Sequence, residues 1–126
     1  MIDQDDIRQA RILLVDDNAA VRRVLTDLLQ RSAYVSVSST GDARAVAPLQ
    51  AAEPFDLVML DLDMPGCDSF SVMAALRAGG AHAAPPVLAM TADPSRKMRA
   101  LEAGARDFID KPFDPVDVLT RIHNVL

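Results

Sequence analysis

The chain has 126 residues, half of them hydrophobic and a quarter charged, with a formal net charge of −5 at pH 7. These values predict one globular domain and argue against non-specific nucleic-acid binding, which needs a basic surface. The single cysteine, Cys67, excludes an internal disulfide and suits a reducing compartment. Because no signal peptide and no apolar run near the roughly 20 residues of a membrane span is visible, we expect a cytoplasmic protein with no membrane contact.

Short apolar segments alternate with segments of helical period along the chain. Five segments are predicted to be strands: Arg11–Val15, Tyr34–Ser38, Leu57–Leu60, Val87–Thr91 and Asp107–Asp110. The first, third and fourth are nearly continuous apolar runs, which is typical of parallel strands covered on both faces. The second alternates polar and apolar residues, which predicts an edge strand.

Four helices are predicted with clear signals. They are Ala19–Arg31 with an amphipathic pattern, Ser69–Ala78 stopped by Gly79-Gly80, Pro94 to about Ala103 ended by Gly104, and a last helix capped by Asp114. The buried stripe of the last helix is expected to contain Val118, Leu119, Ile122, Val125 and Leu126. A fifth helix within Asp42–Ala52 is expected to bend or split near Ala45, because Pro48 removes a hydrogen bond from a helix interior.

Five βα units with short connections predict a parallel sheet with right-handed crossovers. We expect an α/β fold of the flavodoxin-like, doubly wound class, with five parallel strands in the order 2-1-3-4-5 and five helices. Residues 1–10 are interpreted as an N-terminal extension and residues 11–126 as the domain. In this order strands one and three are neighbours, so the residues that end them should meet.

Acidic residues end two of these strands, and a lysine follows another. Asp16 and Asp17 follow the first strand, Asp61 follows the third, and Lys111 follows the fifth. Two carboxylates about 4 Å apart repel each other by about 4 kcal/mol at an effective dielectric of 20. Such a cluster persists by sharing protons or by holding a cation, and an all-oxygen site with room for water suits Mg²⁺.

The same residues suit phosphoryl transfer, which depends mainly on positioning and on neutralising the phosphoryl oxygens. Lys111 supplies a positive charge opposite the metal, and Thr91 supplies a hydroxyl at the end of strand four. The nucleophile is then the carboxylate of Asp61, which gives an aspartyl phosphate.

These marks together resemble the receiver domain of two-component response regulators, over about Arg11 to Leu126. The matching motifs are Asp16-Asp17, Asp61 with Met64-Pro65-Gly66, Thr91-Ala92, and Lys111-Pro112-Phe113. The resemblance implies that Asp61 accepts a phosphoryl group from a histidine kinase or a histidine phosphotransfer protein. It implies a signalling domain rather than an enzyme, with only self-catalysed phosphotransfer and autodephosphorylation.

The resemblance also implies roles for the other site residues. Asp17 and Asp61 bind Mg²⁺ directly, Asp16 acts through water, and Asp63 contributes its backbone carbonyl. Lys111 contacts the phosphoryl group and precedes a cis proline. Thr91 and Phe108 form the switch pair, Asp63 and Asp93 tune the reaction rates, and the readout face is helix four, strand five and helix five, with Arg96, Lys97 and Arg99.

Partners implied by the resemblance are the phosphodonor and a downstream protein or attached output domain, and a phosphorylation-dependent homodimer is compatible with it. Two positions depart from common family patterns. Ser69 stands where glycine is frequent and is interpreted as a cap of helix three, and Phe108 stands where tyrosine is frequent.

Competing interpretations remain at this stage. Asp16-Asp17 could cap the first helix, and Asp93 could cap the fourth. Leu60-Asp61-Leu62-Asp63 resembles the Asp-x-Asp motif of haloacid-dehalogenase-type phosphatases, although Met64-Pro65 follows it here. A degenerate receiver that only binds proteins is a third alternative. Cys67, His82 and His123 have no partner at metal-ligand spacing, so no metal role is assigned to them.

Overall fold

The computed structural model describes residues 4–79 and 83–126. Five parallel strands form one sheet in the order β2-β1-β3-β4-β5, which confirms the predicted topology and places β2 at an edge. The strands are β1 (Arg11–Val15), β2 (Ser36–Thr40), β3 (Leu57–Asp61), β4 (Val87–Thr91) and β5 (Asp107–Asp110).

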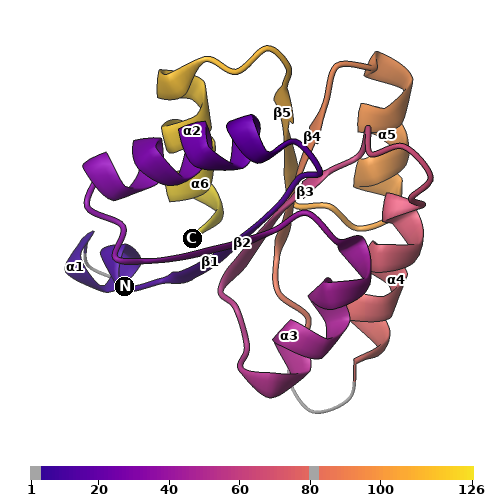
Figure 1. Cartoon of the computed structure of the whole chain (residues 1–126), viewed down its shortest axis with the longest axis horizontal. Coiled ribbons are helices and arrows are strands. Elements are labelled where there is room, and N and C mark those ends of the chain that lie inside the picture. The colour runs from indigo at the N-terminus through magenta and orange to yellow at the C-terminus, as the bar shows by residue number, and fades with distance from the viewer. Residues whose placement is uncertain (1–3, 80–82) are drawn as a thin grey trace.

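Helices cover both faces of the sheet, as Figure 1 shows. One layer contains α1 (Gln4–Arg8), α2 (Ala19–Arg31) and α6 (Pro115–Val125). The other contains the 3-10 turn η1 (Ala43–Ala45), α3 (Val46–Ala52), α4 (Ser69–Ala78) and α5 (Pro94–Glu102). Across the described ranges, no helix is long and apolar enough to cross a bilayer.

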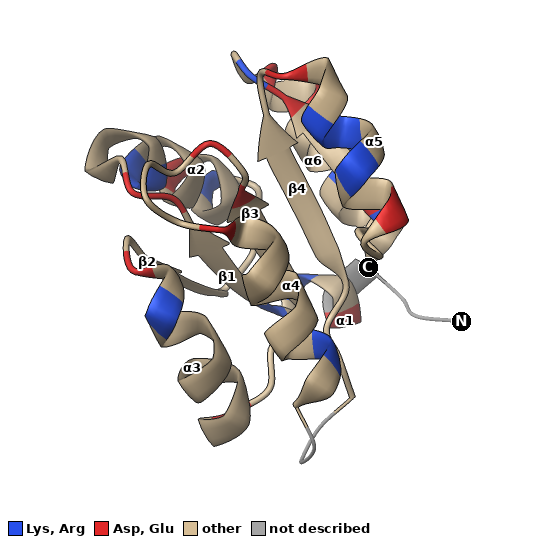
Figure 2. Ribbon diagram, turned by 90° about the vertical axis from the view of Figure 1, so that its right-hand side faces the viewer, with Lys and Arg blue, Asp and Glu red and all other residues tan. Residues whose placement is uncertain are grey.

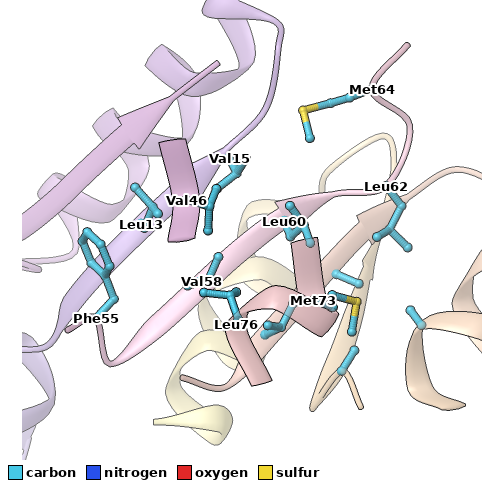
Figure 3. Close-up of a cluster of buried hydrophobic side chains, with 14 residues drawn as sticks. Leu13, Val15, Val46, Phe55, Val58, Leu60, Leu62, Met64, Met73 and Leu76 are labelled. Carbon is cyan, nitrogen blue, oxygen red and sulfur yellow. The ribbon is translucent and has the colours of Figure 1, made fainter. Parts of the chain in front are cut away.

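The two layers pack on alternate side chains of the central strands, because successive strand residues point to opposite faces. Leu13 and Val15 of β1, with Val58 and Leu60 of β3, face the layer of α3, α4 and α5 (Figure 3). Their neighbours in sequence face the layer of α2 and α6, and these are Ile12, Leu14, Leu57 and Met59. Every residue of β3 and β4 is buried, as expected for central parallel strands.

The predicted second strand was placed two residues too early. β2 begins at Ser36, and Tyr34 precedes it as a buried loop residue whose N–H donates to the carbonyl of Leu29. Ala33 turns the chain with a φ of 71°, a conformation that nothing in its sequence signals. The alternating pattern of Tyr34–Ser38 predicted the strand type correctly, but it could not give its start.

The short helix α1 was not predicted, so the described chain has one helix more than expected. Its Ile7 is buried against the same cluster as Leu25 and Leu29 of α2. The carbonyl of Arg8 accepts a hydrogen bond from the N–H of Val35. A five-residue helix has little amphipathic pattern of its own, and its packing on the sheet supplies the stability it lacks alone.

The expected split at Ala45 is confirmed. The 3-10 turn ends at Ala45 and α3 begins at Val46, so Pro48 lies in the first turn of α3. A proline in the first turn loses no intrahelical hydrogen bond, because the N–H groups there have no helical partner.

Candidate functional site

The carboxyl ends of β1 and β3 bring three carboxylates together. Asp16, Asp17 and Asp61 each offer one oxygen, and these oxygens all lie within 4.8 Å of one another. The parallel pairing of β1 with β3 causes this, since it matches Val15 to Leu60 in register. Figure 2 shows acidic residues in the loops at this edge of the sheet.

Asp16 is almost fully buried, and only one of its two oxygens is satisfied. Its Oδ1 accepts the N–H of Asn18 at 2.9 Å, whereas Oδ2 is buried without a hydrogen-bond partner. Burial and the charges of Asp61 and Asp17 raise the pKa of Asp16 above its usual value, against the lowering effect of the Asn18 N–H. An unsatisfied, buried carboxylate oxygen beside two other acids fits a bound cation better than it fits the metal-free protein.

The interpretation of Asp16 and Asp17 as helix caps is wrong. Asn18 is the N-cap of α2, and its side chain accepts the N–H groups of Ala20 and Val21. The two acids are therefore free of a capping role and lie between the strand and the cap.

Lys111 forms the positive side of the site. Its Nζ lies 2.8 Å from Oδ1 of Asp61 and 3.8 Å from both Oδ2 of Asp16 and Oδ2 of Asp63. Burial lowers the pKa of Lys111, but the hydrogen bond and charge of Asp61, with the charges of Asp16 and Asp63, raise it overall. The Lys111–Pro112 peptide bond is cis, as the resemblance implied.

Asp61 is almost fully buried at the last position of β3. Oδ1 accepts both the ammonium of Lys111 and the N–H of Asp63, at 2.8 Å each. Its main-chain carbonyl accepts the hydroxyl of the buried Ser69 at 2.8 Å. Ser69 was interpreted as the cap of α4, and this is wrong, because Asp68 is the N-cap. Ser69 instead fixes the backbone of Asp61.

The carboxylate of Asp63 is not one of the three grouped acids, and it accepts hydrogen bonds from the end of β4. Its Oδ1 accepts the hydroxyl of Thr91 at 2.7 Å, and its Oδ2 accepts the N–H of Ala92 at 3.1 Å. Partial burial raises the pKa of Asp63, but the donors from Thr91, Ala92 and Arg96 and the charge of Lys111 lower it overall. The side chain of Asp63 is therefore the hydrogen-bond acceptor of the Thr91 hydroxyl.

Asp93 is the N-cap of α5, and its Oδ1 accepts both the N–H and the hydroxyl of Ser95. These hydrogen bonds lower the pKa of Asp93. The capping interpretation is thus correct for this residue, and its Oδ2 lies 3.8 Å from the Nε of Arg96.

Phe108 is partly buried and lies near two cations. The Nζ of Lys97 lies 5.1 Å from the ring centroid, and the guanidinium carbon of Arg121 lies 5.3 Å from it. Each cation also contacts acids: Lys97 pairs with Asp110, and Arg121 pairs with Asp107 and Asp117. The ring is thus held at the face formed by α5, β5 and α6.

No motif or periodic pattern places Arg96 in the site. It was expected only on the readout face, yet its Nη1 donates to the carbonyl of Leu62 at 2.8 Å and to Oδ1 of Asp63 at 3.0 Å. The available signal was its place in the first turn of a helix that begins just after Thr91. Cys67 packs in the loop after β3, outside the acid group, and His82 lies outside the described residues.

A doubly wound parallel sheet that brings three acids, a threonine and a lysine to one edge defines a phosphoacceptor signalling domain. Sequence comparison agrees: the family model described as "Response regulator receiver domain" matches residues 12–123. The chain belongs to the response regulator receiver family.

Curated relatives span the length of the chain. "Transcriptional regulatory protein ResD" of Bacillus subtilis is 35% identical over 125 residues, which are 97% of this chain and 50% of that protein. "Response regulator protein FleR" of Pseudomonas aeruginosa is 39% identical over 109 residues, which are 83% of this chain and 22% of that protein. The chain thus spans about half, or less, of the length of these relatives. None of these findings supports the phosphatase alternative.

Solved structures share the fold. The chemotaxis protein CheY4 of Vibrio cholerae, crystallised at low pH, has a TM-score of 0.84 at 28% identity and covers 94% of this chain and 99% of that chain. The receiver domain of sensor histidine kinase PA1611 of Pseudomonas aeruginosa has a TM-score of 0.78 at 26% identity, with 92% of this chain and 96% of that chain covered. That receiver is described with a magnesium ion coordinated in its active site cleft.

Proposed function

We propose that residues 11–126 act as the receiver and that Asp61 is its phosphoacceptor. The single observation that carries this assignment is the contact of 2.8 Å between Asp61 Oδ1 and Lys111 Nζ at the edge of the three-acid group. The hydrogen bonds to the Asp61 side chain from described residues all reach Oδ1. Oδ2 is therefore the oxygen that attacks phosphorus.

The donor is a phosphorylated histidine on a histidine kinase or a histidine phosphotransfer protein. Asp61 Oδ2 forms a bond to phosphorus while the P–N bond of the donor breaks, and the imidazole nitrogen keeps the electron pair and takes up a proton. Lys111 neutralises charge on the transferred group, and the Thr91 hydroxyl and the Ala92 N–H supply hydrogen bonds to its oxygens. Water later attacks phosphorus, the P–O bond to Asp61 breaks, and inorganic phosphate leaves the free carboxylate.

The three-acid group suits Mg²⁺, because its ligands are all oxygens and Oδ2 of Asp16 lacks a partner. We assign Asp17, Asp61 and the backbone carbonyl of Asp63 as direct ligands, with Asp16 acting through water. When bound, Mg²⁺ supplies positive charge that stabilises the phosphoryl oxygens. The chain itself holds its acids at the ends of β1 and β3 before the ion arrives.

Phosphorylation is proposed to shift the equilibrium between two conformations of the face formed by α5, β5 and α6, with Thr91 and Phe108 as the switch pair. Only different contacts in the two states can drive such a shift. The downstream partner is a protein or an attached output domain, and the length of the curated relatives supports the second. The same face suits a phosphorylation-dependent homodimer.

The test is the intact mass after incubation with acetyl phosphate and Mg²⁺. The parent chain should gain one phosphoryl group, and Asp61→Asn should gain none. Asp27→Asn is the matched control, because Asp27 is an exposed acid on α2 that pairs only with Arg31 among the salt bridges of the described residues. Full labelling of Asp61→Asn would remove Asp61 as the acceptor.

A further inference from the structure

The two donors at the end of β4 that face the site are already occupied. The Thr91 hydroxyl donates to Asp63 Oδ1 at 2.7 Å and accepts the N–H of Asp93 at 3.0 Å. The N–H of Ala92 donates to Asp63 Oδ2 at 3.1 Å. Thr91 is fully buried, so its hydroxyl has no route to solvent as an alternative partner.

A phosphoryl group on Asp61 needs the same donors. The carboxylates of Asp61 and Asp63 lie close to the same lysine. The Nζ of Lys111 is 2.8 Å from Asp61 Oδ1 and 3.8 Å from Asp63 Oδ2. The Asp63 carboxylate is an anion with two acceptor oxygens, and a phosphoryl group is an anion with three. One hydroxyl proton and one N–H cannot serve both anions at full strength, and the two anions repel each other.

Arg96 connects this contact to α5. Its guanidinium is shared between the carbonyl of Leu62 and Oδ1 of Asp63, so it joins the loop after β3 to the first turn of α5. The side chain of Arg96 is 44% exposed and that of Asp63 is 27% exposed, which leaves both free to move without opening the core. Figure 2 shows the basic residues along α5 beside this edge of the sheet.

We propose that Asp63 and Arg96 form a lock in which the Asp63 carboxylate takes the place of the phosphoryl group at Thr91 and Ala92. Arg96 is a positioning residue that holds the carboxylate there. Phosphorylation of Asp61 displaces Asp63 from the two donors, and the Arg96 contact with Asp63 weakens, which releases the start of α5 from the loop. The inference rests on the proposed role of Asp61.

Competition and simple repulsion predict different results for two variants. Beryllofluoride at saturating Mg²⁺ serves as the phosphoryl analogue, and the amide NMR signal of Ala92 reports its binding. Asp63→Ala removes both charge and acceptors and should bind beryllofluoride about tenfold more tightly, the scale of a lost charge-assisted hydrogen bond. Asp63→Asn keeps an acceptor, so a neutral hydrogen bond to the donors persists and still competes with beryllofluoride. Its affinity for beryllofluoride should therefore rise only about threefold. Equal gains would show repulsion alone and overturn the lock.

A double-mutant comparison tests whether Arg96 acts through Asp63. Arg96→Gln should tighten beryllofluoride binding in the parent chain but leave it unchanged in Asp63→Ala, because the residue acts only through Asp63. Arg99→Gln is the matched control, since Arg99 lies one turn further along α5 and stacks on the ring of Phe70 at 4.0 Å. Equal effects of Arg96→Gln in both backgrounds would remove Arg96 from the lock.

Asp61→Asn distinguishes a failure of the proposed function from a failure of the lock alone. If it binds beryllofluoride as the parent does, the proposed function fails. If it loses binding while Asp63→Ala binds no more tightly than the parent, only the lock fails.

Discussion

Oδ2 of Asp16 lies 3.8 Å from Nζ of Lys111, too far for a hydrogen bond, and it is buried without another partner. The lysine is held instead by Asp61 at 2.8 Å. No described protein group therefore donates a hydrogen bond to this buried oxygen, which costs stability that a bound cation would restore.

We predict that Asp16→Asn stabilises the metal-free protein by about 1 kcal/mol, the low end of the cost of an unsatisfied buried group. The pKa of Asp16 is raised above 3.8, so its unfavourable charge is present above that pKa and is lost as the pH falls through it. The gain should thus be full at pH 7 and shrink in acid. Urea unfolding with a chelator, at pH 7 and at pH 4 to 5, measures both.

The same variant should lose most of the stabilisation that Mg²⁺ gives the parent, since binding to the folded state alone stabilises it. Asp27→Asn, outside the site, should keep that stabilisation in full. An equal response of Asp16→Asn and the parent to Mg²⁺ would place the metal elsewhere.

Asp93 carries two roles that substitution can separate. As a cap it accepts hydrogen bonds from Ser95, and we predict that its negative charge also repels an anionic donor that approaches the site. Asp93→Ala removes both roles, whereas Asp93→Ser keeps a capping oxygen. At saturating Mg²⁺ both variants should react faster with acetyl phosphate, more at low than at high ionic strength, because salt screens the repulsion.

Thermal unfolding of the same two proteins isolates the cap. Only Asp93→Ala should unfold at a clearly lower temperature. Rates that stay at the parent value at both salt levels would show that Asp93 is a cap and nothing more.

Lys97 and Arg121 are expected to hold Phe108 in the position seen here. Lys97→Met keeps most of the aliphatic stem and removes the charge, so the ring loses a cation–π contact of about 0.5–1 kcal/mol. If the ring moves on phosphorylation, beryllofluoride should bind about two- to fivefold more tightly, since 1.4 kcal/mol is tenfold. Arg99→Met, which removes a cation from Phe70 instead, is the control. Parent-like affinity in Lys97→Met would mean that the ring does not move.

The sequence alone determined the elements whose signals are local. The apolar runs of β1, β3 and β4 and the period of α2 placed these elements correctly, because burial on both faces or on one face dictates the residue pattern. The ends of the strands then predicted which acids meet, since parallel strands finish at one edge. Asp16, Asp17 and Asp61 are grouped in this way by the sequence alone.

Only the tertiary structure decided the contacts that join residues across the site. The start of β2 depends on the turn at Ala33 and on pairing with β1, and a polar alternating segment specifies its register weakly. Whether Asp63 faces the three-acid group or Thr91, and whether Arg96 faces solvent or Asp63, depends on loop geometry and side-chain direction. Neither leaves a periodic pattern, because each is a single contact between elements far apart in the chain.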